Sequence, residues 1–508
     1  MFEINGTIAS AWWFIALGYV VFLVYTVGIM ALGEIIEKKT RLDKTVCRKL
    51  THIISAFVWV ICWFFFGCSI HWVLLNGLGT VALGVVVFGN KMQAYERDDA
   101  KKSYGLFFFG LVTFVVACVT FAVYELAGAE IGMKLYYYAG IAYYCLAFGD
   151  GLAPIVVKLF KNHNVQLTKN RSLVGTLTVF IVSFLTVWAF TAIFNIKMNV
   201  LFMVSVASVT CIAEFYGVRG LDNIFIDLFV FGYLVMNLFG LVGTVFMTVI
   251  AISPVLTCLV YLSKSLSFSG GLSTVIMFYT IGYVSGEDFA PIVFVTVMFL
   301  IASAFAIVSK KVKESREGEK ENVKHTRTAS QVVAVGLVAT ISLIVYHVTA
   351  LSIFCLLYYV CITEQFADSV ASDIGCLTKG KNVNIIGFKP VEKGISGGIS
   401  VLGTCLALVS AFMLMVIPFA IRIEQMSTLC YVLASVIAFV GALMDSVLGS
   451  LFQALYKCRV CGEKTESEYH CGEKAELIKG FPIIKNVTVN LLTSVFTFGA
   501  GFILLLVL

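Results

Sequence analysis

Charged residues and prolines are both scarce in this chain. Asp, Glu, Lys and Arg together make up 13% of its 508 residues, and only 6 residues are proline. A soluble globular protein needs a polar and charged surface, so this composition excludes a soluble protein of this size. Hydrophobic residues make up 60% of the sequence and the mean hydropathy is +0.96, which predicts an integral membrane protein.

Long hydrophilic segments are also missing, apart from Lys310–Arg327, which is too short for a domain and is expected to be a mobile cytoplasmic loop. The 15 cysteines are mostly scattered singly through apolar segments and do not indicate a disulfide framework. The first apolar segment has no preceding basic residues and is long, so we expect a membrane span there rather than a cleavable signal.

Apolar runs of membrane-spanning length recur along the chain. A helix needs about 20 apolar residues to cross a membrane, and about 14–16 segments meet or approach that length. We therefore expect an all-α, polytopic helical membrane protein, in which many of the 42 glycines allow close helix packing. In the first part of the chain the expected spans are Ala11–Leu32, His52–Phe66, Trp72–Phe88, Tyr104–Tyr124, Leu135–Val157 and Leu173–Ile193.

Basic residues are concentrated in alternate loops. The loops near Gly67 and Gly128, for example, carry few of them. Alternation of this kind is the positive-inside pattern, which places the N-terminus outside the cell and every basic loop in the cytoplasm. The basic stretches are 37–49, 158–171, 310–327 and 379–393.

Four polar segments in the first half are unlike ordinary membrane spans. They are Arg48–His52, Phe148–Lys158, Lys169–Thr176, and Glu214 with Leu221–Asn223. The loop charges place all four segments at the same cytoplasmic face. Ionisable groups at membrane depth are costly and usually functional.

The residue types in these segments suit phosphoryl transfer, which depends mainly on positioning and charge stabilisation. Asp150, Glu214 and Asp222 are expected to be catalytic, and the oxygens of Asp150 and Asp222 are ligands that can hold Mg²⁺ on a nucleotide. Taken singly, a basic residue here could instead be an interface anchor that reaches the lipid headgroups. The residues expected to bind nucleotide or phosphate are Arg48, Lys49, His52, Gly149, Gly151, Lys158, Lys169, Arg171, Ser172, Gly175 and Asn223.

The motifs RKLTH, FGDGLA, RSLVGT and LDN, with Glu214 before the last, follow one another within residues 40–232. Together they resemble the polyprenol kinase family, which includes phytol and dolichol kinases. The resemblance implies a fold related to the CDP-lipid synthases and a kinase that uses CTP to phosphorylate a prenyl alcohol. Three positions depart from the family pattern, because Arg171, Val174 and Asp227 replace its usual lysine, glutamate and proline.

The second half, from about Val235, carries a different set of polar motifs. Asp368 and Asp373 are five residues apart, which would place them on different faces of a helix, so we expect an unwound segment that lines a cavity. We expect Asp368, Asp373 and Asp445 to be catalytic, with Asp368 also holding Mg²⁺. The glycines here are candidates for a phosphate-binding loop, although single glycines more often serve helix packing. The residues expected to bind phosphate are Ser396, Gly397, Gly398, Ser400 and Asn490.

These second-half motifs read RTASQV, DSVASD, GISGGIS, DSVLGSLFQ and VN. They resemble the family of phytyl-phosphate kinases and related transmembrane proteins over most of residues 240–508. The resemblance implies phosphorylation of a prenyl monophosphate. Ser369, Asp373 and Ile395 are mild departures from the family pattern, and Val335 replaces an asparagine that the family often has.

One group of cysteines differs from the scattered ones. Cys458, Cys461, His470 and Cys471 have side chains that suit tetrahedral Zn²⁺, as a closed structural site on a cytoplasmic loop. Because His470 and Cys471 are adjacent, they form an awkward pair of ligands for one ion. The alternative is a set of reduced, unliganded cysteines in a reducing compartment.

Two modules, 1–234 and 235–508, thus make a bifunctional lipid kinase our leading hypothesis. The first would phosphorylate a prenyl alcohol with CTP and Mg²⁺, and the second would phosphorylate the resulting monophosphate. One alternative is a CTP-dependent CDP-lipid synthase similar to phosphatidate cytidylyltransferase. Another is a transporter of polyprenyl phosphates, for which no inverted repeat is visible in the sequence. Nothing indicates a nucleic-acid partner.

The alternating loops predict that Lys44, Lys169, Lys320 and Lys389 all face the cytoplasm. Each position would be replaced by cysteine and tested in intact cells with a membrane-impermeant maleimide. We expect labelling only after the membrane is opened, whereas Glu287→Cys, in a loop of the opposite class, should react at once. Labelling of any of the four lysine positions from outside would contradict the shared face.

Overall fold

The chain divides into two compact units, Met1–Val242 (unit 1) and Gly243–Leu508 (unit 2). Val235, where the sequence suggests a module boundary, lies inside the last helix of unit 1. The computed structural model describes residues 12–39, 44–88, 105–160, 165–168, 171–217, 221–262, 266–317, 326–375, 382–391, 395–421 and 426–506.

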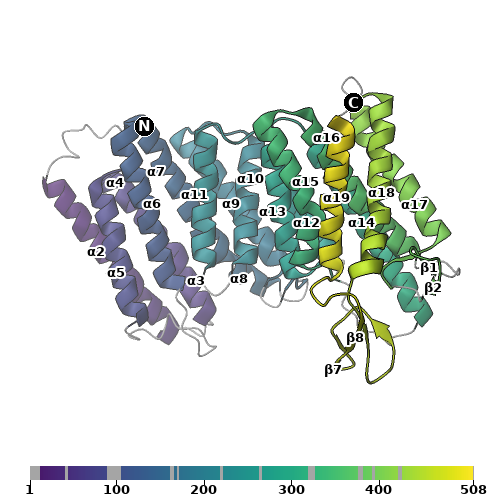
Figure 1. The fold of residues 1–508 in the computed structure, drawn as a ribbon. Coiled ribbons are helices and arrows are strands. Elements are labelled where there is room, and N and C mark those ends of the chain that lie inside the picture. The colour runs from purple at the N-terminus through teal and green to yellow at the C-terminus, as the bar shows by residue number, and fades with distance from the viewer. Residues whose placement is uncertain are drawn as a thin grey trace. The chain divides into compact units, whose positions relative to one another are not determined.

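Unit 1 is a bundle of helices that run alongside one another (Figure 1). In its packing α6 lies against α5, α7 and α11, while α9 lies against α8 and α10. The helices are α2 (Trp12–Lys39), α3 (Lys44–Ser55), α4 (Val58–Phe65), α5 (Ile70–Phe88), α6 (Gly105–Ala127), α7 (Ala129–Tyr144), the π-helix η2 (Cys145–Asp150), α8 (Gly151–Leu159), α9 (Leu173–Phe194), α10 (Val200–Tyr216) and α11 (Asp222–Leu238).

Unit 2 is built around α16 (Ser352–Gly375), which packs against α14, α15, α17, α18 and α19. In the apolar window of α16, 72% of the residues are buried, compared with 28% to 39% in α15, α17, α18 and α19, so α16 is the central helix. The others are α12 (Thr244–Leu262), α13 (Phe268–Val284), α14 (Ala290–Glu317), α15 (Ala329–Thr349), α17 (Val401–Ile421), α18 (Thr428–Phe452) and α19 (Asn486–Leu506).

Helices long and apolar enough to cross a membrane number nine in the described part of the chain, and six shorter apolar helices accompany them. In lipid every backbone N–H and C=O must be satisfied within the protein, which is why apolar runs fold as helices. The structure confirms the expected polytopic all-α class. Two expected spans differ in detail: a turn at 56–57 breaks His52–Phe66, and Leu135–Val157 contains the π-helical turn η2.

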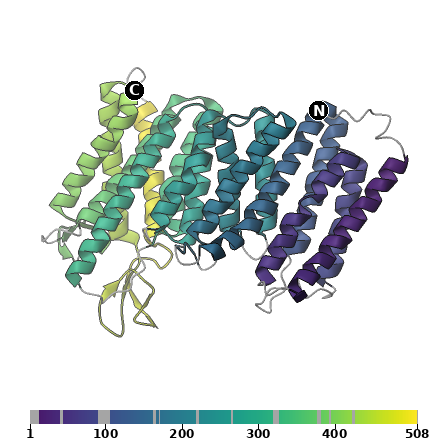
Figure 2. The same ribbon diagram turned by 180° about the vertical axis from the view of Figure 1, so that it is seen from behind.

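Short strands occur in two loops of unit 2, which the expectation of helices alone had omitted. Between α16 and α17, three antiparallel strands pair in the order β2-β1-β3. Between α18 and α19 lies a segment that we call the ribbon, residues 455–479, which projects past the ends of the helices of unit 2 (Figure 1, Figure 2). The strands are β1 (Asn382–Asn384), β2 (Pro390–Val391), β3 (Gly398–Ile399), β4 (Leu455–Lys457), β5 (Lys464–Thr465), β6 (Tyr469–His470), β7 (Glu473–Lys474) and β8 (Glu476–Lys479).

Close helix contact at Gly441 generates a prediction about stability. A Cβ atom on Gly441 would lie 2.2 Å from Oγ1 of Thr497 and 2.7 Å from Cγ of Glu364. Gly441→Ala should therefore overpack this contact, cost about 1–3 kcal/mol, and lower the melting temperature of the protein in detergent.

Gly499 on α19 offers a matched control, because a Cβ atom there would meet no described atom within 4 Å. Gly499→Ala should keep or slightly raise the melting temperature, since alanine is the better helix former. Equal melting temperatures for the two variants would contradict the close contact at Gly441.

Candidate functional sites

A cavity of about 570 Å³ lies in unit 1. Its walls are largely apolar and come mainly from α2 and α5, with further residues from α3 and α6. The polar side chains that line it include five of the residues selected from the sequence, so apolar walls and ionisable groups border the same space. These polar residues are Lys49, His52, Asp150, Asp222 and Asn223, together with Tyr19, Thr26, Thr51 and Ser55.

An ion pair between α3 and η2 borders this cavity. Lys49 Nζ donates to Oδ2 of Asp150, although 101 residues separate the two. Asp150 is buried, with 4% of its surface exposed, and it is the last residue of the π-helical turn. π-Helical turns inside α-helices occur often at functional sites because they redirect side chains.

Arg171 forms a second ionic cluster with acids from two later helices. Its Nη1 donates to Oε1 of the buried Glu214, and its Nη2 lies 3.5 Å from Oδ2 of Asp222. The same Nη2 donates to the carbonyl oxygen of Gly217 at 3.1 Å. Oε2 of Glu214 is buried and has no hydrogen-bond partner among the described atoms. One guanidinium thus holds together the segments that surround Glu214 and Asp222.

The selected glycines of unit 1 are explained by close packing. A Cβ atom on Gly151 would lie 2.5 Å from Ile53 of α3, and one on Gly149 would lie 3.3 Å from Oγ of Ser183. Ser172 caps α9, because its Oγ accepts the N–H of Gly175 at 3.3 Å. These residues therefore shape the backbone around the cavity, and none is among its lining residues.

Three basic residues selected from the sequence are not placed at the cavity. Lys158 lies in the last turn of α8, is exposed, and is not among the lining residues. Lys169 and the side chain of Arg48 fall outside the described residues. Asn223 does line the cavity, and its Nδ2 also donates to the carbonyl oxygen of Gly105 at 2.7 Å, which ties α11 to the start of α6.

A second cavity, of about 210 Å³, lies in unit 2. Asp368 and Asp373 both line it, as does Arg327. The expectation of an unwound segment at Asp368 is wrong, because α16 remains helical to Gly375. Both acids nevertheless line the same cavity, together with Ser369 and Ser372, which lie between them in the sequence.

Glu364 is a buried acid that the sequence-based selection omitted. Its carboxylate accepts hydrogen bonds from Nε2 of Gln365, at 3.1 Å to Oε2, and from Oγ of Ser494 at 3.2 Å. Gln365 also donates to Ser494 Oγ at 2.9 Å and to the carbonyl oxygen of Asn490 at 3.0 Å. Glu364 lies one turn before Asp368, inside an apolar run, and this position was the signal that could have identified it.

Asp445 of α18 faces α19. Thr493 Oγ1 donates to its Oδ2 at 3.2 Å, and the Asn490 amide, oriented to donate, lies 3.3 Å from the same oxygen. Asn490 also lines the cavity of unit 2. The candidate acids Glu364, Asp368, Asp373 and Asp445 thus lie on two helices, α16 and α18, and α19 supplies neutral partners to Glu364 and Asp445.

The glycine loop selected for phosphate binding lies elsewhere in unit 2. Ser396 donates to Oε1 of Glu466 from its backbone N at 2.8 Å and from Oγ at 2.5 Å. Gly397 has a φ of +83°, and a Cβ atom there would lie 2.4 Å from Cβ of Ser450. Gly398 is in β3, and Ser400 Oγ accepts the N–H of Gly403 at 3.1 Å. None of residues 395–400 lines the described cavity of unit 2. The loop instead contacts Ser450 of α18 and Glu466 of the ribbon.

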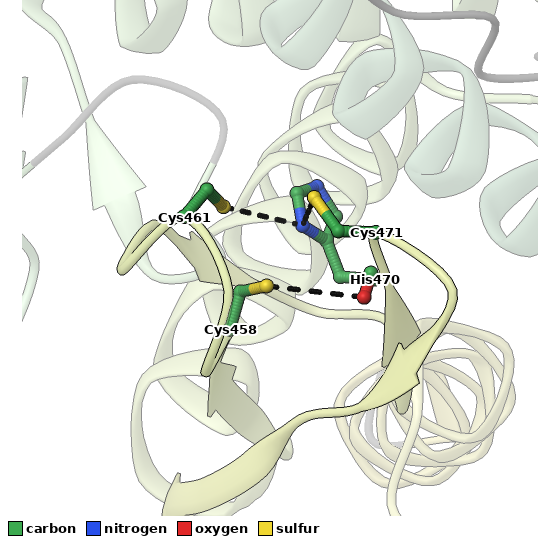
Figure 3. Close-up of side chains that lie close together, drawn as sticks. All are labelled: Cys458, Cys461, His470 and Cys471. Carbon is green, nitrogen blue, oxygen red and sulfur yellow. Dashed lines mark hydrogen bonds between the residues drawn. The ribbon is translucent and has the colours of Figure 1, made fainter.

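The ribbon brings the four selected cysteine and histidine side chains together (Figure 3). Each offers one ligand atom, and these four atoms lie within 4.8 Å of one another. Cys458 is buried, whereas Cys461 and Cys471 are exposed. Hydrogen bonds, chiefly from the backbone of Cys461, lower the pKa of the Cys458 thiol to about 6.

Comparison with known proteins finds a family that matches part of the chain. Residues 251–498 match the model of the family described as integral membrane protein DUF92. No solved structure matches the chain.

Three curated proteins are similar to parts of the chain, each at 26% identity. The phytol kinase of Synechocystis sp. matches over 238 residues, which is 44% of this chain and 92% of the relative. Protein PGR of Arabidopsis thaliana matches over 273 residues, 49% of this chain and 92% of the relative. An uncharacterized membrane protein of Methanocaldococcus jannaschii matches over 207 residues, 40% of this chain and 82% of the relative.

Arg171 generates a prediction that does not depend on the activity. Arg171→Met would leave the buried carboxylate of Glu214 without its cation, and breaking a buried pair in this way costs about 3–5 kcal/mol. The melting temperature in detergent should fall sharply. Adding Glu214→Gln to Arg171→Met should recover much of the loss, because the buried charge is then removed. A double variant no more stable than Arg171→Met would contradict the pairing.

Proposed function

We propose that unit 1 transfers the γ-phosphoryl group of CTP to a prenyl alcohol. The observation that carries the proposal is the cavity of unit 1, whose apolar walls border Lys49, Asp150 and Asp222. An amphiphile with a long hydrocarbon chain and a hydroxyl end suits such a space, because the chain can contact apolar walls while the hydroxyl meets the ionisable groups. Similarity to a phytol kinase supports the same substrate class.

In this reaction the alcohol oxygen bonds to the γ-phosphorus, the bond from that phosphorus to the bridging oxygen breaks, and CDP leaves. The hydroxyl proton passes to a carboxylate, a role that we assign to Asp150 because it lines the cavity. Lys49 and Arg171 would neutralise phosphate charge when they exchange their present carboxylate partners for the nucleotide.

Mg²⁺ is the cation that we propose for unit 1, since carboxylate oxygens are its usual protein ligands. Asp150 and Asp222, whose carboxylates line the cavity, are the residues to which we assign it. When bound, the ion would neutralise charge on the phosphates. The alternating loop charges predict a cytoplasmic face for this site, where CTP is available.

For unit 2 we propose transfer of a second phosphoryl group, to the prenyl monophosphate. This proposal is supported by the acids within the apolar helices α16 and α18, because ionisable groups at membrane depth are costly and usually functional. Asp368, Asp373 and Asp445 keep the catalytic roles inferred from the sequence, with Mg²⁺ held at Asp368, and Glu364 joins them. Arg327 is the basic residue that lines the cavity of this unit and could contact a phosphate.

Paired substitutions test whether each unit carries its own activity. Asp150→Asn removes a charge that acts mainly in the transition state, so phosphorylation of the alcohol should fall at least about a hundredfold. Phosphorylation of added monophosphate should continue. Asp368→Asn should have the reverse effect and let the monophosphate accumulate. Both activities would be measured on purified protein with labelled CTP and separated lipids.

Glu130→Gln is the control, because the carboxylate of Glu130 is 85% exposed and lies outside both cavities. It should leave both activities unchanged. Loss of both activities in either aspartate variant, with the protein folded and in the membrane, would rule out two independent sites.

A further inference from the structure

We infer that the ribbon is a zinc site, in which Cys458, Cys461, His470 and Cys471 are the four ligands of one structural Zn²⁺. The inference concerns residues outside both cavities and does not depend on the proposed kinase activity. Three thiolates and one imidazole form a familiar ligand set for structural zinc, and four protein ligands leave no position open for a substrate.

Two of the distances between the ligand atoms are close to those expected around a tetrahedral ion, and all four atoms lie within 4.8 Å of one another. His470 Nδ1 lies 3.5 Å from Sγ of Cys461 and 3.3 Å from Sγ of Cys471. With Zn–S near 2.3 Å and Zn–N near 2.0 Å, tetrahedral geometry places ligand atoms about 3.5–3.8 Å apart. Figure 3 shows dashed lines from the His470 ring to the thiols of Cys461 and Cys471, and one from Cys458 to the carbonyl oxygen of His470.

Two turns of the ribbon each supply two of the ligands. In the first, Cys458 and Cys461 flank the turn between β4 and β5, and the N–H of Val460 donates to Sγ of Cys458 at 3.4 Å. In the second, Cys471 follows His470 in the turn between β6 and β7. Cys471 has a φ of +51°, which bends the chain so that adjacent side chains converge. With this left-handed conformation at Cys471, the adjacent residues His470 and Cys471 can both be ligands of one ion.

The ribbon lacks the hydrophobic core that its strands would need to be stable alone. Its buried hydrophobic cluster consists of Tyr456 and Ala475, joined by Ala454 just before the ribbon. Its strands are two to four residues long and exposed at most positions. Small domains with so little core usually depend on a metal or on disulfides, and a bound metal contributes its binding free energy to folding.

Zinc would stabilise the ribbon, which connects two helices that carry candidate site residues of unit 2. The ribbon joins α18, which carries Asp445, to α19, which carries Asn490 and Thr493. Between the two zinc-binding turns lies Glu466, which accepts both hydrogen bonds from Ser396. We therefore assign the ion a structural role: it fixes the ribbon, and through Glu466 it fixes the glycine loop against α18.

Metal analysis of the full-length protein, purified in detergent under reducing conditions without chelators, tests the inference. We expect about one Zn²⁺ per chain in the wild type and less than about one tenth in Cys461→Ser. Cys405→Ser is the matched control, because Cys405 is an exposed cysteine on α17 and outside the ribbon, so zinc content should stay at the wild-type level.

A second measurement on the wild type avoids reliance on a variant that could misfold. Treatment with a thiol-blocking reagent should release the zinc, which a metal-sensitive dye detects, and trypsin should then cleave faster at the exposed Arg459 and Lys474. Wild-type protein without zinc, or folded Cys461→Ser with a full zinc content, would overturn the inference.

Discussion

Burial of charge in an apolar environment is the constraint on which both candidate sites depend. An isolated ionised group in such surroundings costs many kcal/mol, so each must gain a partner. In unit 1 the partners are basic side chains of the same unit: Lys49 pairs with Asp150, and Arg171 pairs with Glu214 and Asp222.

Unit 2 meets the same constraint differently. The partners described for Glu364 and Asp445 are neutral: an amide from Gln365 and hydroxyls from Thr493 and Ser494. Neutral donors compensate a carboxylate only in part, so a bound cation would find stronger attraction here than in unit 1.

Sequence patterns predicted those features of the structure that depend on residues close together in the sequence. Apolar runs determine where helices form, and ionisable residues within them marked Asp150, Glu214 and Asp368 as unusual. Contacts between distant segments could not be predicted in this way. Around the glycine loop, Gly397 packs on Ser450 and Ser396 binds Glu466, contacts across 53 to 70 residues that no local motif reveals.

Backbone geometry was equally inaccessible from the sequence. Neither the π-helical turn that ends at Asp150 nor the unbroken helix at Asp368 was predicted from the sequence. The ribbon shows the reverse case, since the spacing of Cys458 and Cys461 was informative, while the left-handed turn at Cys471 became visible only in the fold.

The most direct measurement follows the γ-phosphorus of CTP. Purified protein would be incubated with Mg²⁺, a panel of prenyl alcohols and CTP labelled either at the γ- or at the α-phosphate. The account predicts that γ-label appears in the lipid and that α-label remains in CDP. Label from the α-phosphate in the lipid, with release of γ-labelled pyrophosphate, would identify a CDP-lipid synthase instead. Lipid movement across the membrane without consumption of CTP would identify a transporter, and either result would contradict the kinase.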